Sequence, residues 1–179
     1  SDSGSPLISD PGNQLVNFLY QNNIKIFSIP GPSALISGIQ LSGFLNKKFF
    51  SFLGFLPKKP SQKISILKAQ MDNNLVIYTT KLQLEKDIEA IASIAARFEI
   101  IILKELTKMF EERIHLSHDN YKEVDLKTIK GELVLAVNII SSSLILFLLF
   151  QGRKISKRNS PLSQQVLNQQ LIIQSLNLH

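Results

Sequence analysis

The first part of this chain alternates between helical and extended patterns. Apolar residues recur at helical spacing over residues 13–22, which predicts a helix. Residues 25–29 form a short segment rich in β-branched and aromatic residues, which predicts a strand. A Pro-Gly-Pro-Ser loop follows, and its Ser33 is suited to cap a helix over residues 34–42. Such alternation is typical of an α/β domain with a parallel sheet, where ligands bind beyond the carboxyl ends of the strands.

The pattern changes after Lys47 and Lys48. Residues 49–57 have the aromatic density of a strand. Helices are then predicted over residues 61–71 and 82–98, and strands over 74–79, 99–103, 111–117 and 132–137. These elements predict a mixed sheet with helices. We therefore divide the chain into the C-terminal part of a first α/β domain (1–47), a second α/β domain (48–138) and a divergent tail (139–179).

The apolar residues 133–150 raise the question of a transmembrane helix. Asn138 and a run of three serines at 141–143 interrupt them, and the uniformly apolar remainder is shorter than the roughly 20 residues that such a helix needs. We therefore predict no membrane insertion. The Gln-, Asn- and Ser-rich end from residue 160 onward shows only a weak helical period over 166–178.

Composition narrows the classes of partner. The chain carries 20 Lys and Arg against 14 Asp and Glu, a net charge of +6, which favours a polyanionic partner because lysines that face phosphates release counterions. Solvated surface charge remains an equal alternative for each basic cluster. One cluster contains Lys47, Lys48, Lys58, Lys59, Lys63 and Lys68, and a second contains Arg153, Lys154, Lys157 and Arg158.

Cysteine and histidine usage argues against a metal centre. There is no cysteine, which excludes disulfides and thiolate ligands, and the three histidines are scattered. Together with the absence of a signal peptide pattern, this favours a reducing environment. We expect a cytoplasmic protein that binds no metal.

Two loops and one charged segment could carry chemistry. Residues 1–12 and 30–33 are rich in Gly, Pro, Ser and Asp, and Gly4 lets a backbone approach a ligand closely. Glu105 and Thr107 directly follow a predicted strand, at the edge where a polar substrate group could be held. The alternative is that Glu105 and Lys108 form a local ion pair at i and i+3, worth a few tenths of a kcal/mol.

Five motifs occur in a fixed order along the chain. They are Ser-Asp-Ser-Gly-Ser-Pro-Leu-Ile-Ser-Asp-Pro-Gly (1–12), Pro-Gly-Pro-Ser-Ala (30–34), Phe-Leu-Gly-Phe-Leu-Pro (52–57), Glu-Leu-Thr-Lys (105–108) and Lys-Gly-Glu (130–132). In this combination the chain resembles the ribosomal RNA small subunit methyltransferase I family, within the tetrapyrrole methylase superfamily of class III methyltransferases. The resemblance covers residues 1–137. It implies a tetrapyrrole-methylase-like α/β fold with a cofactor cleft between two α/β domains.

The resemblance also implies a reaction. Members of the family use S-adenosyl-L-methionine to methylate the 2′-hydroxyl of a cytidine in 16S rRNA. A sulfonium donor needs no covalent intermediate, so catalysis consists of alignment and removal of the hydroxyl proton. The resemblance further implies a small ribosomal subunit as partner, a homodimer and no membrane. Its implied cofactor-binding residues are Asp2, Ser3, Gly4, Ser5, Pro30, Gly31 and Ser33, and the catalytic candidates are Glu105 and Lys108.

Three departures qualify this interpretation. Family members begin with a strand, a Pro-Ile-Gly-Asn loop and a Glu-Asp-Thr-Arg segment that are not found ahead of Ser1. Glu-Ser-Pro-His-Arg is replaced after Tyr78 by Thr-Thr-Lys-Leu-Gln, and the usual Glu-Gly ending is missing after Val137. We therefore expect an N-terminally truncated member that is inactive by itself. The alternatives are a methylase of a tetrapyrrole precursor and a non-catalytic RNA-binding remnant.

Overall fold

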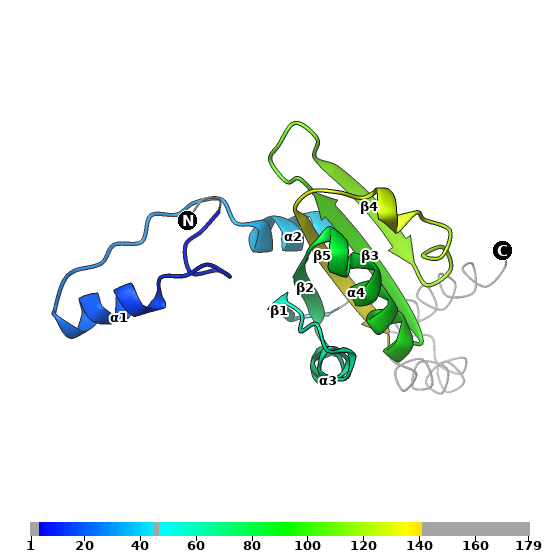
Figure 1. The fold of residues 1–179 in the computed structure, drawn as a ribbon, viewed down its shortest axis with the longest axis horizontal. Helices are drawn as coiled ribbons and strands as arrows, with labels where there is room; N and C mark the ends of the chain where they lie inside the picture. Colours follow the sequence, from blue (N-terminus) through cyan, green and yellow to red (C-terminus); the bar gives the residue numbers. More distant parts are fainter. Residues whose placement is uncertain (1–3, 45–46, 141–179) are drawn as a thin grey trace, which may run out of the picture. The chain divides into compact units, whose positions relative to one another are not determined.

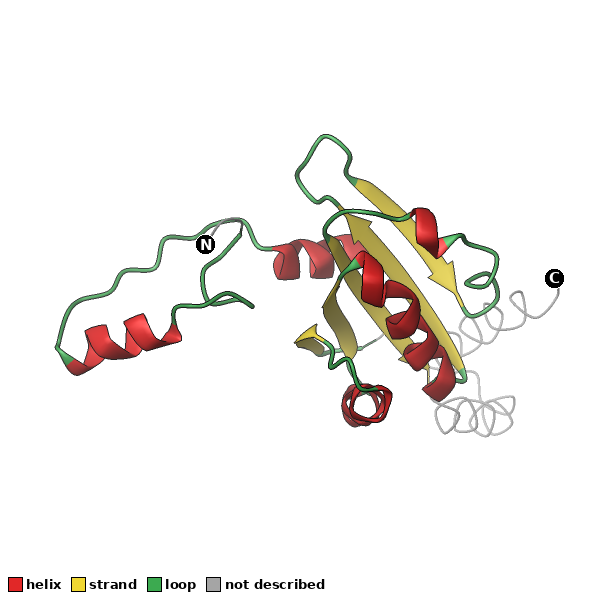
Figure 2. Ribbon diagram, in the orientation of Figure 1, coloured by secondary structure: helices red, strands yellow, loops and turns green. Residues whose placement is uncertain are grey.

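The computed structural model describes residues 4–44 and 47–140. The described residues up to Ile139 belong to one compact unit. The helices are α1 (Asn13–Gln21), α2 (Ala34–Ser42), α3 (Pro60–Gln70) and α4 (Lys81–Ile94), with a 3-10 turn η1 at Leu126–Thr128 (Figure 1). The strands are β1 (Phe50–Phe55), β2 (Asn74–Thr79), β3 (Arg97–Lys104), β4 (Glu112–Ser117) and β5 (Leu133–Ile140) (Figure 2).

The five strands form one mixed sheet in the order β1-β2-β5-β3-β4. β1 pairs with β2 in parallel, whereas β5 runs antiparallel to β2 and β4 antiparallel to β3. Phe55 pairs with Tyr78, and Thr79 pairs with Leu133. The carboxyl ends of β1 and β2 therefore lie beside the start of β5.

One backbone bond adds β3 to the same edge. The N–H of Glu105, just after β3, donates to the carbonyl oxygen of Glu132, just before β5 (2.9 Å). The carboxyl end of β3 consequently meets the start of β5 as well. Three carboxyl ends at one edge of an α/β sheet are the place where such folds bind ligands.

Helices cover both faces of the central strands. Leu67 of α3 and Ile88 of α4 pack with Leu75 and Leu135 in one buried cluster. Val76 and Val134, the sequence neighbours on the opposite face, belong to a second cluster against which Leu35 of α2 packs. A strand buried on both faces is apolar at successive positions, which is why β2 and β5 show no polar alternation.

Most predicted elements are confirmed. The helices predicted over 13–22, 34–42 and 61–71 agree with α1, α2 and α3 within one residue at each end, and the strand over 74–79 is β2. The predicted mixed sheet is also observed. Ser33 precedes α2 with an extended backbone, and its carbonyl oxygen rather than its side chain binds the helix, accepting from the Ser37 N–H at 3.0 Å.

The strand predicted over residues 25–29 is wrong. These residues form a loop whose apolar side chains face solvent, with Ile29 89% exposed. A strand needs a neighbour for its backbone groups, and within the described ranges no strand pairs with this segment. Local composition favoured the extended state but could not supply a partner.

The helix predicted over residues 82–98 ends early. α4 stops at Ile94, because the residues from Arg97 onward begin β3 and Phe98 is buried in the core. The apolar run from residue 133 begins as the strand β5 and not as a helix. In the part of the chain that is described, no helix is both long and apolar enough to cross a bilayer. Residues 141–150 of that run lie outside the described residues.

Candidate functional site

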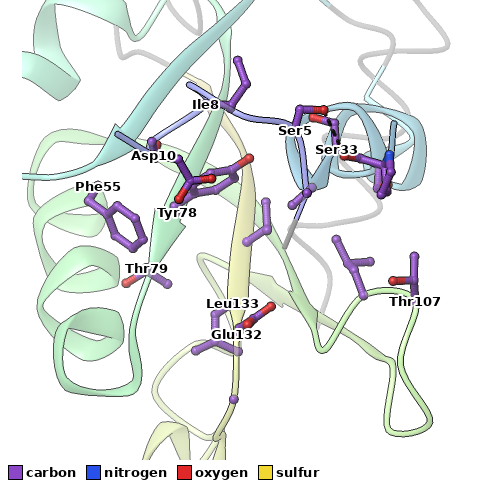
Figure 3. A pocket seen from close by; sticks show the side chains of 18 of the residues that line it. Ser5, Ile8, Asp10, Ser33, Phe55, Tyr78, Thr79, Thr107, Glu132 and Leu133 are labelled. Atoms are coloured by element: carbon purple, nitrogen blue, oxygen red, sulfur yellow. Dashed lines mark hydrogen bonds between the residues drawn. The ribbon is translucent and has the colours of Figure 1, made fainter. Parts of the chain in front are cut away.

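A cavity of about 410 Å³ opens at the edge where the carboxyl ends of β1, β2 and β3 meet. Its volume is in the range of small-molecule and cofactor sites. Figure 3 shows side chains that reach it from the first loop, from α2, from β1 and β2, and from the segments around Thr107 and Glu132. Residues far apart in sequence therefore form one site.

The first wall consists of the two Gly/Pro-rich loops. Gly4 has a φ of 77°, in the left-handed region that favours glycine, and Ser5 Oγ donates to the Pro32 carbonyl oxygen at 3.0 Å. This bond holds the two loops together. Of the predicted cofactor-binding residues, Gly4, Ser5 and Ser33 line the cavity and Pro30 and Gly31 do not. Asp2 and Ser3 lie outside the described residues.

Tyr78 and Phe55 form the wall that β2 and β1 contribute. Their rings meet edge to face, with centroids 5.7 Å apart. The pKa of the Tyr78 hydroxyl is raised, chiefly because the group is partly buried. A hydrogen bond to the backbone of Leu35 lowers the pKa in part, and the nearby Asp10 carboxylate raises it. The hydroxyl therefore stays protonated at neutral pH and is a hydrogen-bond donor at the cavity.

The opposite wall is a strained turn. Glu105 and Thr107 have positive φ angles of 50° and 65°, which are uncommon outside glycine and most unfavourable for a β-branched residue. The Thr107 N–H donates to the Glu111 carboxylate at 2.6 Å, and the Glu132 N–H donates to Glu105 Oε1 at 2.6 Å. These two bonds hold a conformation that the backbone alone disfavours.

The predicted catalytic candidates are ion-paired. Lys108 Nζ lies 3.2 Å from Glu105 Oε2 and 3.1 Å from Glu132 Oε2, so the local i, i+3 pair expected as the alternative is present. Neither Glu105 nor Lys108 lines the cavity, whereas Glu132 does. Their catalytic role stays a prediction.

Both groups titrate away from their ordinary values. The hydrogen bond from the Glu132 backbone, followed by Lys108, lowers the pKa of Glu105. The Glu132 and Glu105 carboxylates raise the pKa of Lys108. Glu105 and Lys108 therefore both favour their charged forms.

Among the cavity residues that sequence reasoning did not assign to the site are three that can form hydrogen bonds to a ligand: Asp10, Tyr78 and Glu132. Tyr78 lies near the end of a predicted strand, the signal that pointed to Glu105, so the same argument could have found it. Glu132 follows Gly131 in the last of the five motifs. In the described part of the chain, no group of three or more His, Asp or Glu residues could hold a metal ion.

Comparison with known proteins agrees with the motif resemblance. The family described as "Tetrapyrrole (Corrin/Porphyrin) Methylases" matches residues 1–119. A ribosomal RNA small subunit methyltransferase I from Leptospira biflexa is 34% identical over 147 residues, 80% of this chain and 60% of that protein. One from Hydrogenobaculum is 37% identical, over 77% of this chain and 61% of that protein. The chain spans about three-fifths of the length of these two relatives.

Solved structures share the fold. The methyltransferase CobJ superposes with a TM-score of 0.56 at 14% identity, over 76% of this chain and 62% of that chain. Cobalt precorrin-4 methyltransferase gives a TM-score of 0.56 at 9% identity, over 75% and 61%. A uroporphyrin-III C-methyl transferase from Thermus thermophilus complexed with S-adenyl homocysteine gives 0.50 at 15% identity, over 75% and 62%. At these identities the likeness shows a common fold.

Proposed function

The chain belongs to the tetrapyrrole methylase family, and from this we propose that its cavity at the sheet edge binds S-adenosylmethionine for methyl transfer to ribosomal RNA. The resemblance to ribosomal RNA small subunit methyltransferase I is confirmed by relatives at 34% and 37% identity. The observation that carries the proposal is the cavity, where the two Gly/Pro-rich loops meet the carboxyl ends of the strands.

The residues present fit such a cofactor. Gly4, Ser5 and Ser33 combine backbone without bulky side chains and two hydroxyl groups, which suits the polar parts of a nucleoside. Val134, Leu133 and Leu106 give the remaining wall an apolar surface. Bound there, S-adenosylmethionine would supply an electrophilic methyl group.

Charge in the cavity favours a cationic ligand. The side chains of Asp10 and Glu132 both line it (Figure 3). A carboxylate near a positive sulfur is stabilising, more so in a partly enclosed site than in water. We therefore assign Asp10 to recognition of the charge that distinguishes S-adenosylmethionine from its neutral-sulfur product.

The acceptor side of the reaction needs a hydroxyl group held in line and freed of its proton. We assign proton acceptance to the Glu132 carboxylate. Of the two carboxylates that pair with Lys108, it is the one that lines the cavity. Lys108 fixes the Glu132 side chain through the ion pair, and Glu105 fixes its backbone. Glu105 and Lys108 are thus positioning residues in this proposal.

For the substrate we propose a cytidine 2′-hydroxyl of 16S rRNA in the small ribosomal subunit, in the cytoplasm, with the enzyme acting as a homodimer. The names of the relatives support a ribosomal RNA substrate. The net charge of +6 supports a polyanion rather than a small neutral acceptor. A tetrapyrrole precursor is the alternative that the family description keeps open.

The test is calorimetric titration with S-adenosylmethionine and with S-adenosylhomocysteine. We expect both to bind, and Asp10→Asn to weaken the first more than the second, since only the first carries the positive sulfur. Asp72→Asn removes an exposed carboxylate that does not line the cavity and is the matched control. Equal weakening of both ligands by Asp10→Asn would contradict the assignment of Asp10.

Transfer is then followed with a radiolabelled methyl donor and purified small ribosomal subunits. Label in 16S rRNA, lost in Glu132→Gln, is the result that the proposal expects, and it would overturn the expectation, drawn from the sequence, that the chain is inactive by itself. Label in a uroporphyrinogen instead of RNA would establish the alternative. A chain that binds neither sulfur compound would contradict the proposed function.

A further inference from the structure

A second cavity, of about 350 Å³, borders the first. The two share Phe55, Tyr78, Thr79 and Thr80. The second cavity alone is lined by Leu56, Lys58, Leu82, Gln83 and Asp87. A ligand that occupied it would be separated from the first cavity only by this shared wall, so the inference below rests on the proposed function of that first cavity.

The shared wall offers an aromatic surface. Phe55 is 57% exposed although its ring contacts Tyr78, and Leu82 at the start of α4 is 82% exposed. An exposed aromatic ring beside an apolar side chain is a surface on which a planar base can stack. Solvent is a poor environment for both side chains, so covering them is favourable.

Gln83 adds an unsatisfied polar group. Its Oε1 atom has no accessible surface and no hydrogen-bond partner. A buried acceptor without a partner is unfavourable, and natural structures keep few of them. Rotation of the side chain toward the cavity that it lines would present the amide, a donor and an acceptor, to the edge of a base.

Lys58 provides the charge. It is exposed in the loop between β1 and α3 and lines the second cavity. Lys59, its neighbour, and Lys81, the first residue of α4, are exposed too. An ammonium group beside a stacking surface is the combination that holds single-stranded nucleic acid.

We propose that the second cavity binds an unpaired nucleobase of the RNA substrate next to the ribose that is methylated. The base stacks on Phe55, the Gln83 amide hydrogen-bonds its edge, and Lys58 contacts the adjoining phosphate. Phe55 is the last residue of β1, Lys58 lies in the loop that follows it, and Gln83 lies in the first turn of α4. Base recognition would therefore take place directly beside the cofactor cavity.

The test measures affinity for a fluorescently labelled decamer of cytidine ribonucleotides by anisotropy. Gln83→Leu is expected to weaken binding about tenfold. Lys58→Gln is expected to weaken RNA binding and to reduce the slope of log affinity against log salt concentration by about one. Gln14→Leu on α1 and Lys122→Gln near Tyr121, both exposed, are the matched controls. S-adenosylhomocysteine titration of each variant should match the unmodified chain, because neither Gln83 nor Lys58 lines the first cavity.

The outcomes separate the two proposals. If the unmodified chain binds S-adenosylhomocysteine and RNA, and Lys58→Gln and Gln83→Leu behave like their controls, the base site is overturned and the proposed function stands. Binding of the sulfur compound without RNA also overturns the base site. If the unmodified chain binds neither, the proposed function fails and the base site with it. Lys58 is exposed, so its variant tests the proposal even if Gln83→Leu disturbs folding.

Discussion

The Glu105 carboxylate occupies the space that the missing side chain of Gly131 leaves open. An added Cβ at Gly131 would lie 2.8 Å from Cγ and from Cδ of Glu105, closer than real Cβ atoms approach other heavy atoms. The backbone of Gly131 also has a φ of 106°, which side chains rarely adopt. This contact lets Glu105 bind the Glu132 N–H and so sets the position of Glu132 at the cavity.

Gly131→Ala should therefore both destabilise the protein and disturb the site. We expect a loss of about 1–3 kcal/mol in the free energy of unfolding, from backbone strain and from displacement of Glu105. Urea denaturation followed by circular dichroism measures it. Gly31→Ala is the control, because an added Cβ there meets nothing within 4 Å. Equal stability of the two variants would show that the Gly131–Glu105 contact is not needed.

The strained backbone at Thr107 predicts a variant that is more stable than the natural sequence. Asn tolerates a positive φ better than a β-branched residue does, so Thr107→Asn should raise the free energy of unfolding by up to about 1 kcal/mol. Thr107→Val keeps the branching and should give no gain. If ligand binding falls in Thr107→Asn while stability rises, the strain serves the site. A lower melting temperature for Thr107→Asn than for Thr107→Val would refute the strain.

We expect the stability of the fold to depend on pH because Lys108 forms ion pairs with Glu105 and Glu132. Because the folded-state pKa of Glu105 is lowered, its stabilising contribution is present above the ordinary value of 4.5 and is lost as the pH falls through the folded-state pKa. Lys108 has a raised pKa, so its contribution is present below 10.5 and is lost as the pH rises through the folded value.

Glu105→Gln should consequently lower the free energy of unfolding near neutral pH, and it should change that free energy little in strong acid. Unfolding midpoints in urea at about pH 7 and about pH 3 measure the difference. Glu123→Gln, an exposed carboxylate elsewhere, is the control and should show a smaller change. A cost for Glu105→Gln that is the same at both pH values would mean that the charge contributes nothing.

A buried ion pair between α3 and α4 predicts that the effects of substituting its two residues on stability are strongly coupled. Lys63 of α3 binds the Asp87 carboxylate of α4, with both side chains almost fully buried, and Thr79 Oγ1 donates to the same carboxylate. Lys63→Met should cost about 3–5 kcal/mol because it leaves a buried charge uncompensated. The double variant Lys63→Met with Asp87→Leu should recover much of that loss. A double-mutant cycle by urea unfolding measures the coupling, and additive costs would argue against it.

Local patterns predicted most elements because each carries its own signal. β2 was predicted at its observed bounds, since residues 74–79 form a short apolar run between polar turns. The strand at 25–29 failed although its composition is equally β-rich, because a strand exists only where another strand accepts its hydrogen bonds. Pairing is a property of the assembled sheet and not of the segment.

The candidate site divides in the same way. Glu105 and Thr107 were placed at the carboxyl edge from their position after a predicted strand, and the structure puts Thr107 in the cavity wall. Asp10, Tyr78 and Glu132 come from three distant segments. The register of β2 and β5 brings Tyr78 and Glu132 to one edge, and Asp10 reaches the same cavity from the first loop. No spacing along the chain encodes that meeting.

The positions of the charged side chains show most clearly what the sequence determined and what the tertiary structure decided. By itself the sequence determined the α/β class, most elements, the family motifs and the basic excess, because these depend on residue types and short-range order. It could not show that Lys63, grouped with the surface lysines, lies buried against Asp87, or that Lys47 donates to the carbonyl oxygens of Met71, Asn73 and Ile139. Tertiary structure decided which charges face solvent and which residues share a cavity, since burial depends on what packs around a side chain from elsewhere in the chain.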